Sequence, residues 1–278
     1  MLREMQSAEK LGLLVSHLDG EVRVEETVIG DLRGVQFCLP LKDCSLVYLP
    51  WPGTVEQPVF ALTAQYEDIK VRGVEVTQPR RTLCYGQSYK YSGREHKLES
   101  EAPAEVESLM SFTRAMYEAK DAASNTESAT SMMCLANMYR TGYHCIDEHS
   151  DDCDQMSSIR DVVCWVIGAP RRLIIRSRKA HGHKKLLCVG IPTGIYIMKG
   201  EWFQRTYTHE IPREKESMYN RLCAIVPREI MAQGKLHAAD WLAEHPEEIA
   251  ARYPKDVKDY TQWRNPRCSY TVRFFAAK

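Results

Sequence analysis

The sequence lacks the features that would place it in a simple class. It carries no excess of charge, because 37 lysine and arginine residues balance 37 aspartate and glutamate residues over 278 positions. A globally basic nucleic-acid coat is therefore excluded, and any contact with nucleic acid must come from a local patch. No apolar run reaches the roughly 18 residues that a membrane-spanning helix needs, so no membrane segment is expected. We find no internal repeat and no low-complexity tract.

A secretion signal is also missing. The N-terminal stretch carries acidic residues early, and its apolar segment from Leu11 to Val15 is short and interrupted by Gly12. That pattern does not fit a signal peptide. Ten cysteines are scattered along the chain, and several lie inside apolar runs, such as Cys134 and Cys164. We expect reduced thiols in an intracellular protein of the cytoplasm or nucleus.

What the chain does contain is an ordinary globular composition. Hydrophobic residues make up 44% and charged residues 27%, which excludes a disordered chain. The length allows one large domain or two small ones. Residues 1–80 combine short apolar stretches with turn signals, which predicts several strands and one short helix. From Pro103 to residue 123, apolar side chains recur at helical spacing and predict an amphipathic helix.

The second half is dominated by short blocks rich in β-branched and aromatic residues. The predicted strands are Met132–Tyr139, Ile159–Gly168, Arg172–Arg178, Leu186–Val189, Gly194–Met198, Arg205–His209 and Cys268–Phe275. Strands at this spacing indicate a sandwich or barrel. Residues 213–263 interrupt the pattern with helical sequence, and Pro246 is placed as a helix N-terminus should be. We expect a helical insertion between two strands of a β core.

The segment from Tyr143 to Asp152 contains the chemistry. His149 and Asp151 lie two residues apart, so in an extended chain both side chains face the same side. His209 lies near the end of a later predicted strand. Two histidines and one carboxylate form the facial triad of non-haem Fe(II) oxygenases.

A zinc site is an alternative for the same segment. Cys145, His149 and Cys153 each stand four residues apart, and His144 is adjacent. Structural zinc sites usually contain paired cysteine knuckles. This sequence has none of them, which favours iron.

The surrounding blocks resemble the AlkB family of Fe(II)- and 2-oxoglutarate-dependent dioxygenases. In order along the chain, they are Pro79-Arg80-Arg81 with Tyr85-Gly86 and Tyr89 to Gly93, Asn137-x-Tyr139 with Gly142 and His149-Ser150-Asp151-Asp152, Ser158 to Arg172, Met198-x-Gly200 with Gln204 and His209-x-x-Pro212, and Arg267-x5-Arg273. The blocks occur in the family's order and span residues 79–275, apart from the insertion.

The resemblance implies a mainly β (α+β) fold, with a double-stranded β-helix or jelly-roll core, flanking helices and the helical insertion. It places the dioxygenase domain at residues 79–278 and the insertion at about 213–263. Residues 1–78 then form an N-terminal extension on the substrate side.

The resemblance also assigns roles and cofactors. His149, Asp151 and His209 would bind Fe(II), with 2-oxoglutarate and O2 as cosubstrates. Arg267 would hold the distal carboxylate of 2-oxoglutarate, which suits a planar guanidinium that stays charged. The rest of the cosubstrate pocket would be Asn137, Tyr139, Thr271 and Arg273.

The family's usual substrate is an N-methylated base in DNA or RNA that is flipped into the pocket. Residues 171–185 contain many lysines and arginines and no acid, and they predict a basic hairpin able to grip phosphates. The expected substrate-binding residues are Arg80, Tyr85, Tyr89, Tyr91, Asp152, Cys153, Arg171, Arg176 and Arg178. Trp51 and Trp202 are further candidates for stacking on a base.

Two departures from the family pattern keep other substrates open. Cys153 stands where repair members carry an acid, and a thiol cannot neutralise a cationic methylated base. The insertion begins beside an iron ligand and could form a lid, a substrate wall or the surface for a protein partner. The first alternative is therefore the same oxygenase chemistry on a protein side chain or small molecule. The second is a binding module that keeps the fold without catalysis.

Overall fold

The computed structural model describes residues 2–58, 65–71, 74–87, 90–91, 94–95, 98, 101–121, 131–151 and 160–275. Its helices are α1 (Leu2–Lys10), α2 (Ala104–Asp121), η1 (Lys179–His181), α3 (Phe203–Thr206), α4 (Glu216–Leu222), η2 (Cys223–Ile225), α5 (Arg228–Gln233), α6 (Lys235–Glu244), α7 (Pro246–Arg252) and α8 (Val257–Trp263). No helix in this part of the chain is both long and apolar enough to cross a lipid bilayer.

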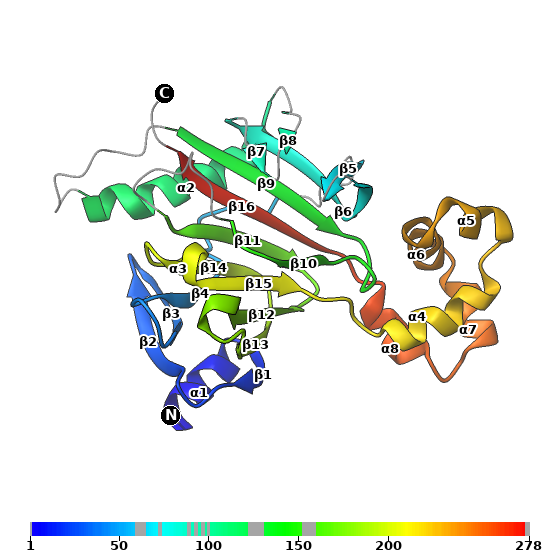
Figure 1. Ribbon diagram of the computed structural model, residues 1–278, viewed down its shortest axis with the longest axis horizontal. Coiled ribbons are helices and arrows are strands. Elements are labelled where there is room, and N and C mark those ends of the chain that lie inside the picture. The colour runs from blue at the N-terminus through cyan, green and yellow to red at the C-terminus, as the bar shows by residue number, and fades with distance from the viewer. Residues whose placement is uncertain are drawn as a thin grey trace.

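Two antiparallel sheets form the body of the molecule (Figure 1). The large sheet has the order β2 (Arg23–Ile29), β3 (Leu32–Cys38), β4 (Ser45–Pro50), β14 (Gly194–Lys199), β11 (Val162–Gly168), β16 (Arg267–Phe275), β9 (Ser131–Tyr139), β6 (Val74–Gly86) and β5 (Gln65–Val71). The small sheet has the order β1 (Leu14–Leu18), β13 (Lys185–Ile191), β12 (Arg171–Ser177), β15 (Tyr207–Ile211) and β10 (Ile146–His149). A separate short ribbon pairs β7 (Lys90–Tyr91) with β8 (Arg94–Glu95).

The strand order is that of a jelly roll. From β9 to β16, successive strands alternate between the large and the small sheet, except at β12 and β13, which form a hairpin within the small sheet. The first and last of these eight strands, β9 and β16, pair along their whole length. The predicted double-stranded β-helix is therefore confirmed, with α2 and the helical insertion outside it.

The alternation of side chains along each strand explains the two cores of the β body. On β11, Val162, Cys164 and Val166 pack between the sheets, whereas Val163 and Trp165 belong to a second core on the outer face. That outer core is covered by α2, and the Trp165 indole donates a hydrogen bond to Thr113 at 2.8 Å. Period-two burial on both faces is typical of a strand covered on both sides. The predicted amphipathic helix is thus confirmed as the cover of the large sheet.

The N-terminal residues build into both sheets. Strand β1 pairs with β13 in the small sheet, and β4 pairs with β14 in the large one. Strand β6 crosses the predicted boundary at residue 78 without a break. The prediction of several strands and one short helix is confirmed, and these strands extend the jelly roll.

One predicted strand is wrong at its start. Residues Phe203–Thr206 form the single helical turn α3, so β15 begins at Tyr207 and not at Arg205. The Thr206 amide donates to the carbonyl of Trp202 at 2.9 Å, which closes the turn. A helix this short carries too few residues for a periodic signal in sequence.

The predicted insertion forms a helical unit, α4 to α8, between β15 and β16, at one end of the sheets (Figure 1). It has its own apolar core, which includes Tyr219, Leu242 and Trp263. Gly142 lies against this core, and a Cβ there would collide with the Trp263 ring. As predicted, Pro246 begins a helix, α7.

A buried polar network fastens the helical unit to the edge of the large sheet. The Asp240 carboxylate on α6 accepts hydrogen bonds from Tyr66 at 2.8 Å and from Arg81 at 2.6 Å, which lie on β5 and β6. The Tyr66 hydroxyl also contacts Nε2 of buried His144 at 2.7 Å. Burial lowers the pKa of His144 to about 4, so its imidazole is neutral near pH 7. The unit is therefore fixed to the body by groups that are costly to separate.

Candidate metal and cosubstrate site

Two neighbouring strands of the small sheet bring the predicted triad together. His149 on β10 and His209 on β15 are register partners, and their ring centroids lie 4.2 Å apart. Asp151 follows β10 directly, with its carboxylate oxygens 3.7 Å from His149 Nε2 and 3.6 Å from His209 Nε2. One ligand atom from each residue lies within 4.8 Å of the others. Such an arrangement can hold one metal ion and leave one face of it open.

The charges at the triad favour metal binding at neutral pH. Burial lowers the pKa of His209 to about 3 and also lowers the pKa of His149. Burial acts to raise the pKa of Asp151, but Arg273 and the two imidazoles outweigh it and hold that pKa well below its usual range. The site therefore offers two neutral imidazoles and one carboxylate, the protonation states that a divalent metal needs.

Residues around the triad fix the orientation of its ligands. His149 Nδ1 lies 2.8 Å from the carbonyl oxygen of Asp147, which assigns the ring proton to Nδ1 and leaves Nε2 free to bind metal. The Asp151 carboxylate accepts a 2.6 Å hydrogen bond from Arg273, and its backbone N–H donates to the Gln204 side-chain carbonyl at 2.9 Å. Gln204 was part of the sequence motif, but its role as support for Asp151 becomes visible only in the structure.

The predicted cosubstrate residues share one inner surface. On β16, Arg267, Thr271 and Arg273 alternate with residues of the outer core, so all three face the small sheet. Asn137 and Tyr139 face the same way on the adjacent β9, where Arg267 is the register partner of Tyr139. The period of two along paired strands is what gathers these five residues.

Arg267 is buried with unused hydrogen-bonding capacity. It is 1% exposed and donates from Nη1 to the carbonyl of Ile191 at 2.9 Å. Among the described residues, its Nε and Nη2 have no partner. A buried guanidinium with two open donors fits a carboxylate, which would accept both in a bidentate pair. Tyr139, Tyr196 and Cys164 surround it; Tyr196 and Cys164 were not predicted from the sequence, although the inward position of Tyr196 on β14 was a signal.

The other pocket residues are linked to one another. The Asn137 side-chain oxygen accepts a hydrogen bond from Arg80 at 2.7 Å. The guanidinium of Arg171 lies 5.8 Å from the centroid of the Tyr139 ring. The Thr271 hydroxyl lies 3.5 Å from the Cys164 sulfur. Arg80 thus reaches the cosubstrate side of the site through Asn137.

Two predicted substrate residues lie elsewhere. Tyr85 faces the outer core under α2 and is 6% exposed, because its position on β6 alternates with inward-facing Cys84. Arg171 is also buried, and it donates to the carbonyls of Thr141, His144 and Pro212. Both therefore support structure instead of contacting substrate. Tyr89, Asp152, Cys153 and the side chain of Tyr91 lie outside the described part of the chain.

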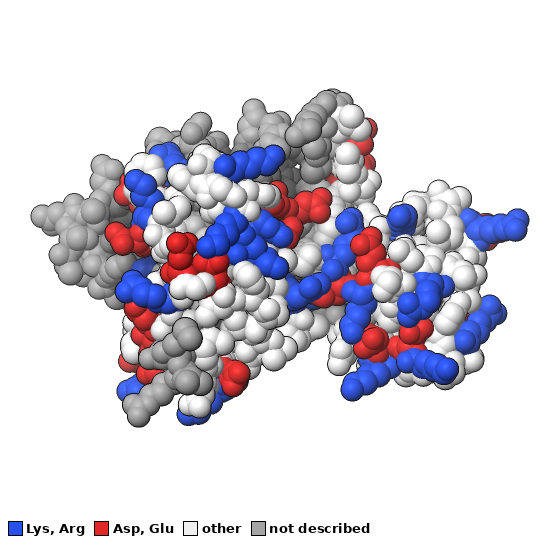
Figure 2. Space-filling view, turned by 60° about the horizontal axis from the view of Figure 1, so that its bottom comes forward, with Lys and Arg blue, Asp and Glu red and all other residues white. Residues whose placement is uncertain are grey.

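The predicted basic hairpin is formed by β12, η1 and β13, but several of its charges are paired. Arg176 forms a 2.6 Å ion pair with Glu210, and Lys184 pairs with Asp19 at 2.9 Å. Arg178 donates to the Ser150 hydroxyl at 2.8 Å, between two triad residues. Figure 2 shows lysine and arginine side chains interleaved with acidic ones on one face of the molecule. Arg178 is thus the hairpin cation closest to the triad segment.

The zinc alternative finds no support in the geometry. The metal-ligand group formed by the described residues is the triad, and it does not include Cys145. Burial raises the pKa of Cys145 to about 11, which keeps the thiol protonated, whereas zinc binds thiolates. Cys153 lies outside the described residues.

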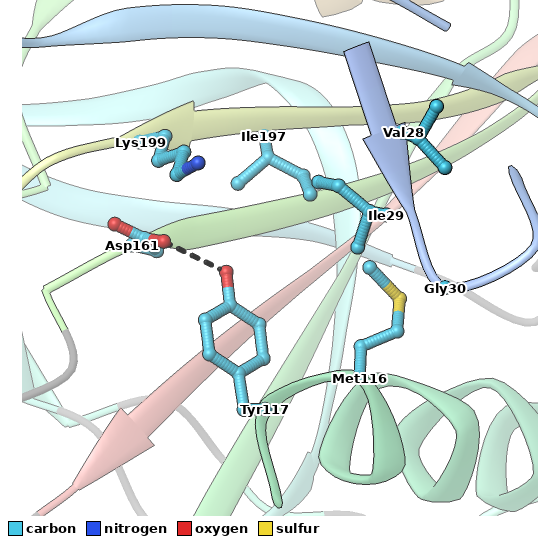
Figure 3. Close-up of a pocket in the computed structure, with 8 residues that line it drawn as sticks. All are labelled: Val28, Ile29, Gly30, Met116, Tyr117, Asp161, Ile197 and Lys199. Atoms are coloured by element: carbon cyan, nitrogen blue, oxygen red, sulfur yellow. Dashed lines mark hydrogen bonds between the residues drawn. The ribbon is translucent and has the colours of Figure 1, made fainter. Parts of the chain in front are cut away.

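A cavity of about 300 Å³ lies on the opposite, outer face of the large sheet (Figure 3). Val28, Ile29, Met116 and Ile197 form its apolar walls, while Lys199 and Asp161 lie at its polar end. The Tyr117 hydroxyl donates to Asp161 at 2.9 Å. No triad residue lines this cavity, so it is separate from the metal site.

Comparison with known proteins identifies the family. The sequence profile of the 2OG-Fe(II) oxygenase superfamily matches residues 55–273. The chain belongs to the 2OG-Fe(II) oxygenase superfamily. This oxygenase therefore uses Fe(II), 2-oxoglutarate and O2, and its His-Asp-His group and the open donors of Arg267 fit that requirement.

Solved structures that resemble the oxygenase include two of this chemistry or of related name. A prolyl-4-hydroxylase from Pseudomonas putida is 9% identical, with 72% of this chain and 74% of that chain covered and a TM-score of 0.34. OsALKBH1 is 15% identical, with 70% and 78% covered and a TM-score of 0.36. No curated protein sequence matches the chain.

Proposed function

We propose that this oxygenase oxidises a nucleobase in DNA or RNA in the manner of the AlkB family, by demethylation or hydroxylation. The observation that carries the proposal is the link between the triad segment and the basic hairpin. Arg178 of that hairpin donates to Ser150, which stands between His149 and Asp151. A phosphate bound near Arg178 would lie close to the metal, where a flipped base must enter.

The residues divide the work between metal and cosubstrate. His149, Asp151 and His209 would hold Fe(II), while Arg273 and Gln204 keep the Asp151 carboxylate in place. Arg267 would bind the distal carboxylate of 2-oxoglutarate through Nε and Nη2. Asn137, Tyr139 and Thr271 would line the same pocket.

When bound, Fe(II) and 2-oxoglutarate supply the oxidation of a C–H bond by O2, with release of succinate and carbon dioxide. The protein contributes orientation, charge and exclusion of water. At an N-methyl group, the hydroxymethyl product loses formaldehyde. Arg267 and the ligand-binding side of the triad are at least 94% buried except for His149, whose side chain is 14% exposed. Substrate would therefore approach from the His149 side.

A second candidate is the same chemistry on a protein side chain or a small molecule. Equal numbers of acidic and basic residues and the mixed charges in Figure 2 favour it. The helical unit would then supply the surface for a protein partner. A purely non-catalytic module fits less well, because the whole triad and both arginines are assembled.

The test is turnover by the full chain with Fe(II), 2-oxoglutarate and ascorbate, alone and with methylated single- and double-stranded DNA and RNA oligonucleotides. Succinate and formaldehyde would be measured together, with mass spectrometry of the oligonucleotide. We expect one oligonucleotide to stimulate succinate formation with matching loss of its methyl group or gain of one oxygen. Succinate formation that no oligonucleotide stimulates would contradict the proposal and favour a protein or small-molecule substrate.

A further inference from the structure

One exposed aromatic side chain lies close to the triad segment. Trp202 stands just before α3, between β14 and β15, and is 40% exposed. Every other large hydrophobic side chain exposed to a similar degree in the described residues is aliphatic or a methionine. Trp51, the other tryptophan considered for stacking, packs against Trp165 at 4.9 Å in the outer core. Trp202 is therefore the aromatic candidate that solvent can reach.

Two cations lie against the Trp202 ring. Lys42 Nζ is 5.4 Å from the ring centroid, and Arg205 Cζ is 5.6 Å from it. Lys42 comes from the turn between β3 and β4, so two segments far apart in sequence build this cluster. Within the described residues, no ion pair is found for Lys42. Cations on an indole face are a favourable contact that also positions them beside a stacked group.

The cluster is continuous with the metal site. The carbonyl of Arg205 accepts a hydrogen bond from Arg178 at 3.4 Å, and the other end of the Arg178 guanidinium donates to Ser150. A chain of contacts therefore runs from the triad segment through Arg178 to Arg205 and on to Trp202. A polymer with one residue at the metal would reach this cluster with a neighbouring residue.

We infer that Trp202, Lys42 and Arg205 bind the single-stranded part of a nucleic acid that flanks the oxidised base. One base would stack on Trp202, and the phosphates beside it would contact Lys42 and Arg205. This inference rests on the proposed function and adds the form of the substrate. In a duplex the base faces are covered by their neighbours, whereas an unpaired base can stack on an aromatic ring.

Charge alone would not make this surface. Asp43 and Glu201 are exposed and adjacent in sequence to Lys42 and Trp202, so the cluster has little net charge. Stacking must then supply most of the affinity, with a small contribution from release of counterions. That balance predicts a strong effect of removing the ring and a modest effect of salt.

The test is binding of a fluorescein-labelled single-stranded oligonucleotide and of a hairpin duplex to the full chain, followed by anisotropy. The single strands are a thymidine oligomer and a uridine oligomer of about 15 nucleotides. The variants are Trp202→Ala, Trp202→Phe and the double substitution Lys42→Ala with Arg205→Ala. Met231→Ala and Lys258→Ala serve as matched controls, because both residues are exposed on the helical unit.

We expect tighter binding of the single strand than of the duplex. Trp202→Ala should weaken single-strand binding about tenfold, while Trp202→Phe retains most of it. The double variant should weaken binding and reduce the slope of log affinity against log salt by about one. The two controls should match the wild type.

Each contrary result has a distinct meaning. If the wild type binds the single strand and both Trp202→Ala and the double variant bind equally well, this inference is overturned and the proposed function stands. Equal binding of duplex and single strand also overturns it. If the wild type binds no nucleic acid at about 50 mM salt, the proposed function itself fails. The double variant keeps the test decisive should Trp202→Ala not fold.

Discussion

At the scale of single residues, the metal site depends on a carboxylate that is held from three sides. Asp151 contacts Arg273 and Gln204, and its carboxylate lies between two histidines. Both supporting side chains also reach methionine sulfurs, Arg273 at Met133 and Gln204 at Met198, each at 3.7 Å. The support is therefore embedded in the inner core and does not move freely.

Replacing a ligand should remove the metal site. We expect His149→Ala or Asp151→Ala to abolish succinate formation and to lose tight binding of Mn(II), followed by calorimetry. Glu148→Gln is the matched control, because Glu148 is adjacent to His149 but pairs with His183 on the surface. Cosubstrate turnover that persists in both ligand variants would show that the triad is misassigned.

Removing the support behind Asp151 should weaken the metal site without destroying it. Gln204→Leu leaves the Asp151 amide without its acceptor, and changes in such supporting contacts typically lower metal affinity about tenfold or more. Co(II) absorption and Mn(II) calorimetry would measure the change. An unaltered affinity and spectrum would mean that Arg273 alone positions Asp151.

Arg267 allows a separate test of cosubstrate binding. Arg267→Ala removes a charged hydrogen-bonding group and should weaken 2-oxoglutarate binding by about 1.5–3 kcal/mol, while Mn(II) binding stays intact. Arg172→Ala is the control, since Arg172 is exposed and pairs with Glu214. Equal loss of 2-oxoglutarate and metal binding would instead indicate a disturbed fold.

At the scale of elements, strand alternation decided which sequence predictions succeeded. The triad could be predicted because His149 and Asp151 are close in sequence, and the arginines of β16 because they share one face of one strand. Tyr85 could not be placed, since β6 is covered on both faces and its sequence does not say which face meets the site. Arg171 failed for another reason: a buried arginine that caps backbone carbonyls has no sequence signature distinct from a surface one.

The attachment of the helical unit gives a prediction about stability. Asp240→Ala would leave Arg81 and Tyr66 without their shared acceptor, so the free energy of unfolding should fall by about 3 kcal/mol. Glu244→Ala breaks the exposed pair with Arg140 on the same helix and should cost less than about 1 kcal/mol. Urea denaturation would compare the two. Equal effects would show that the buried network does not hold the unit.

The same network makes stability depend on pH. The pKa of His144 is about 4 in the folded chain and near 6.5 when unfolded. Between these values the unfolded chain binds one more proton, so its contribution to stability is lost as pH falls from about 6.5 to about 4. His144→Gln should flatten this part of the dependence of unfolding free energy on pH. An unchanged slope would mean that His144 is not the titrating group.

At the scale of the whole molecule, the jelly roll could be expected from the motif order, but the pairing of the N-terminal strands could not. Strands β1 and β4 pair with partners more than 140 residues away, and such long-range contacts leave no local pattern. The jelly roll therefore extends beyond the motif blocks on one side, while the helical unit extends it on the other.

The central claim is that the triad and Arg267 together form one site for Fe(II) and 2-oxoglutarate. The most direct test is an anaerobic titration of the Fe(II)-loaded chain with 2-oxoglutarate, followed by the visible charge-transfer absorption that chelation of Fe(II) by a 2-oxo acid produces. We predict a saturable band in the wild type, no band in Asp151→Ala, and a band in Arg267→Ala that needs more than tenfold higher 2-oxoglutarate. A wild type without the band, or an Asp151→Ala variant that keeps it, would contradict the account.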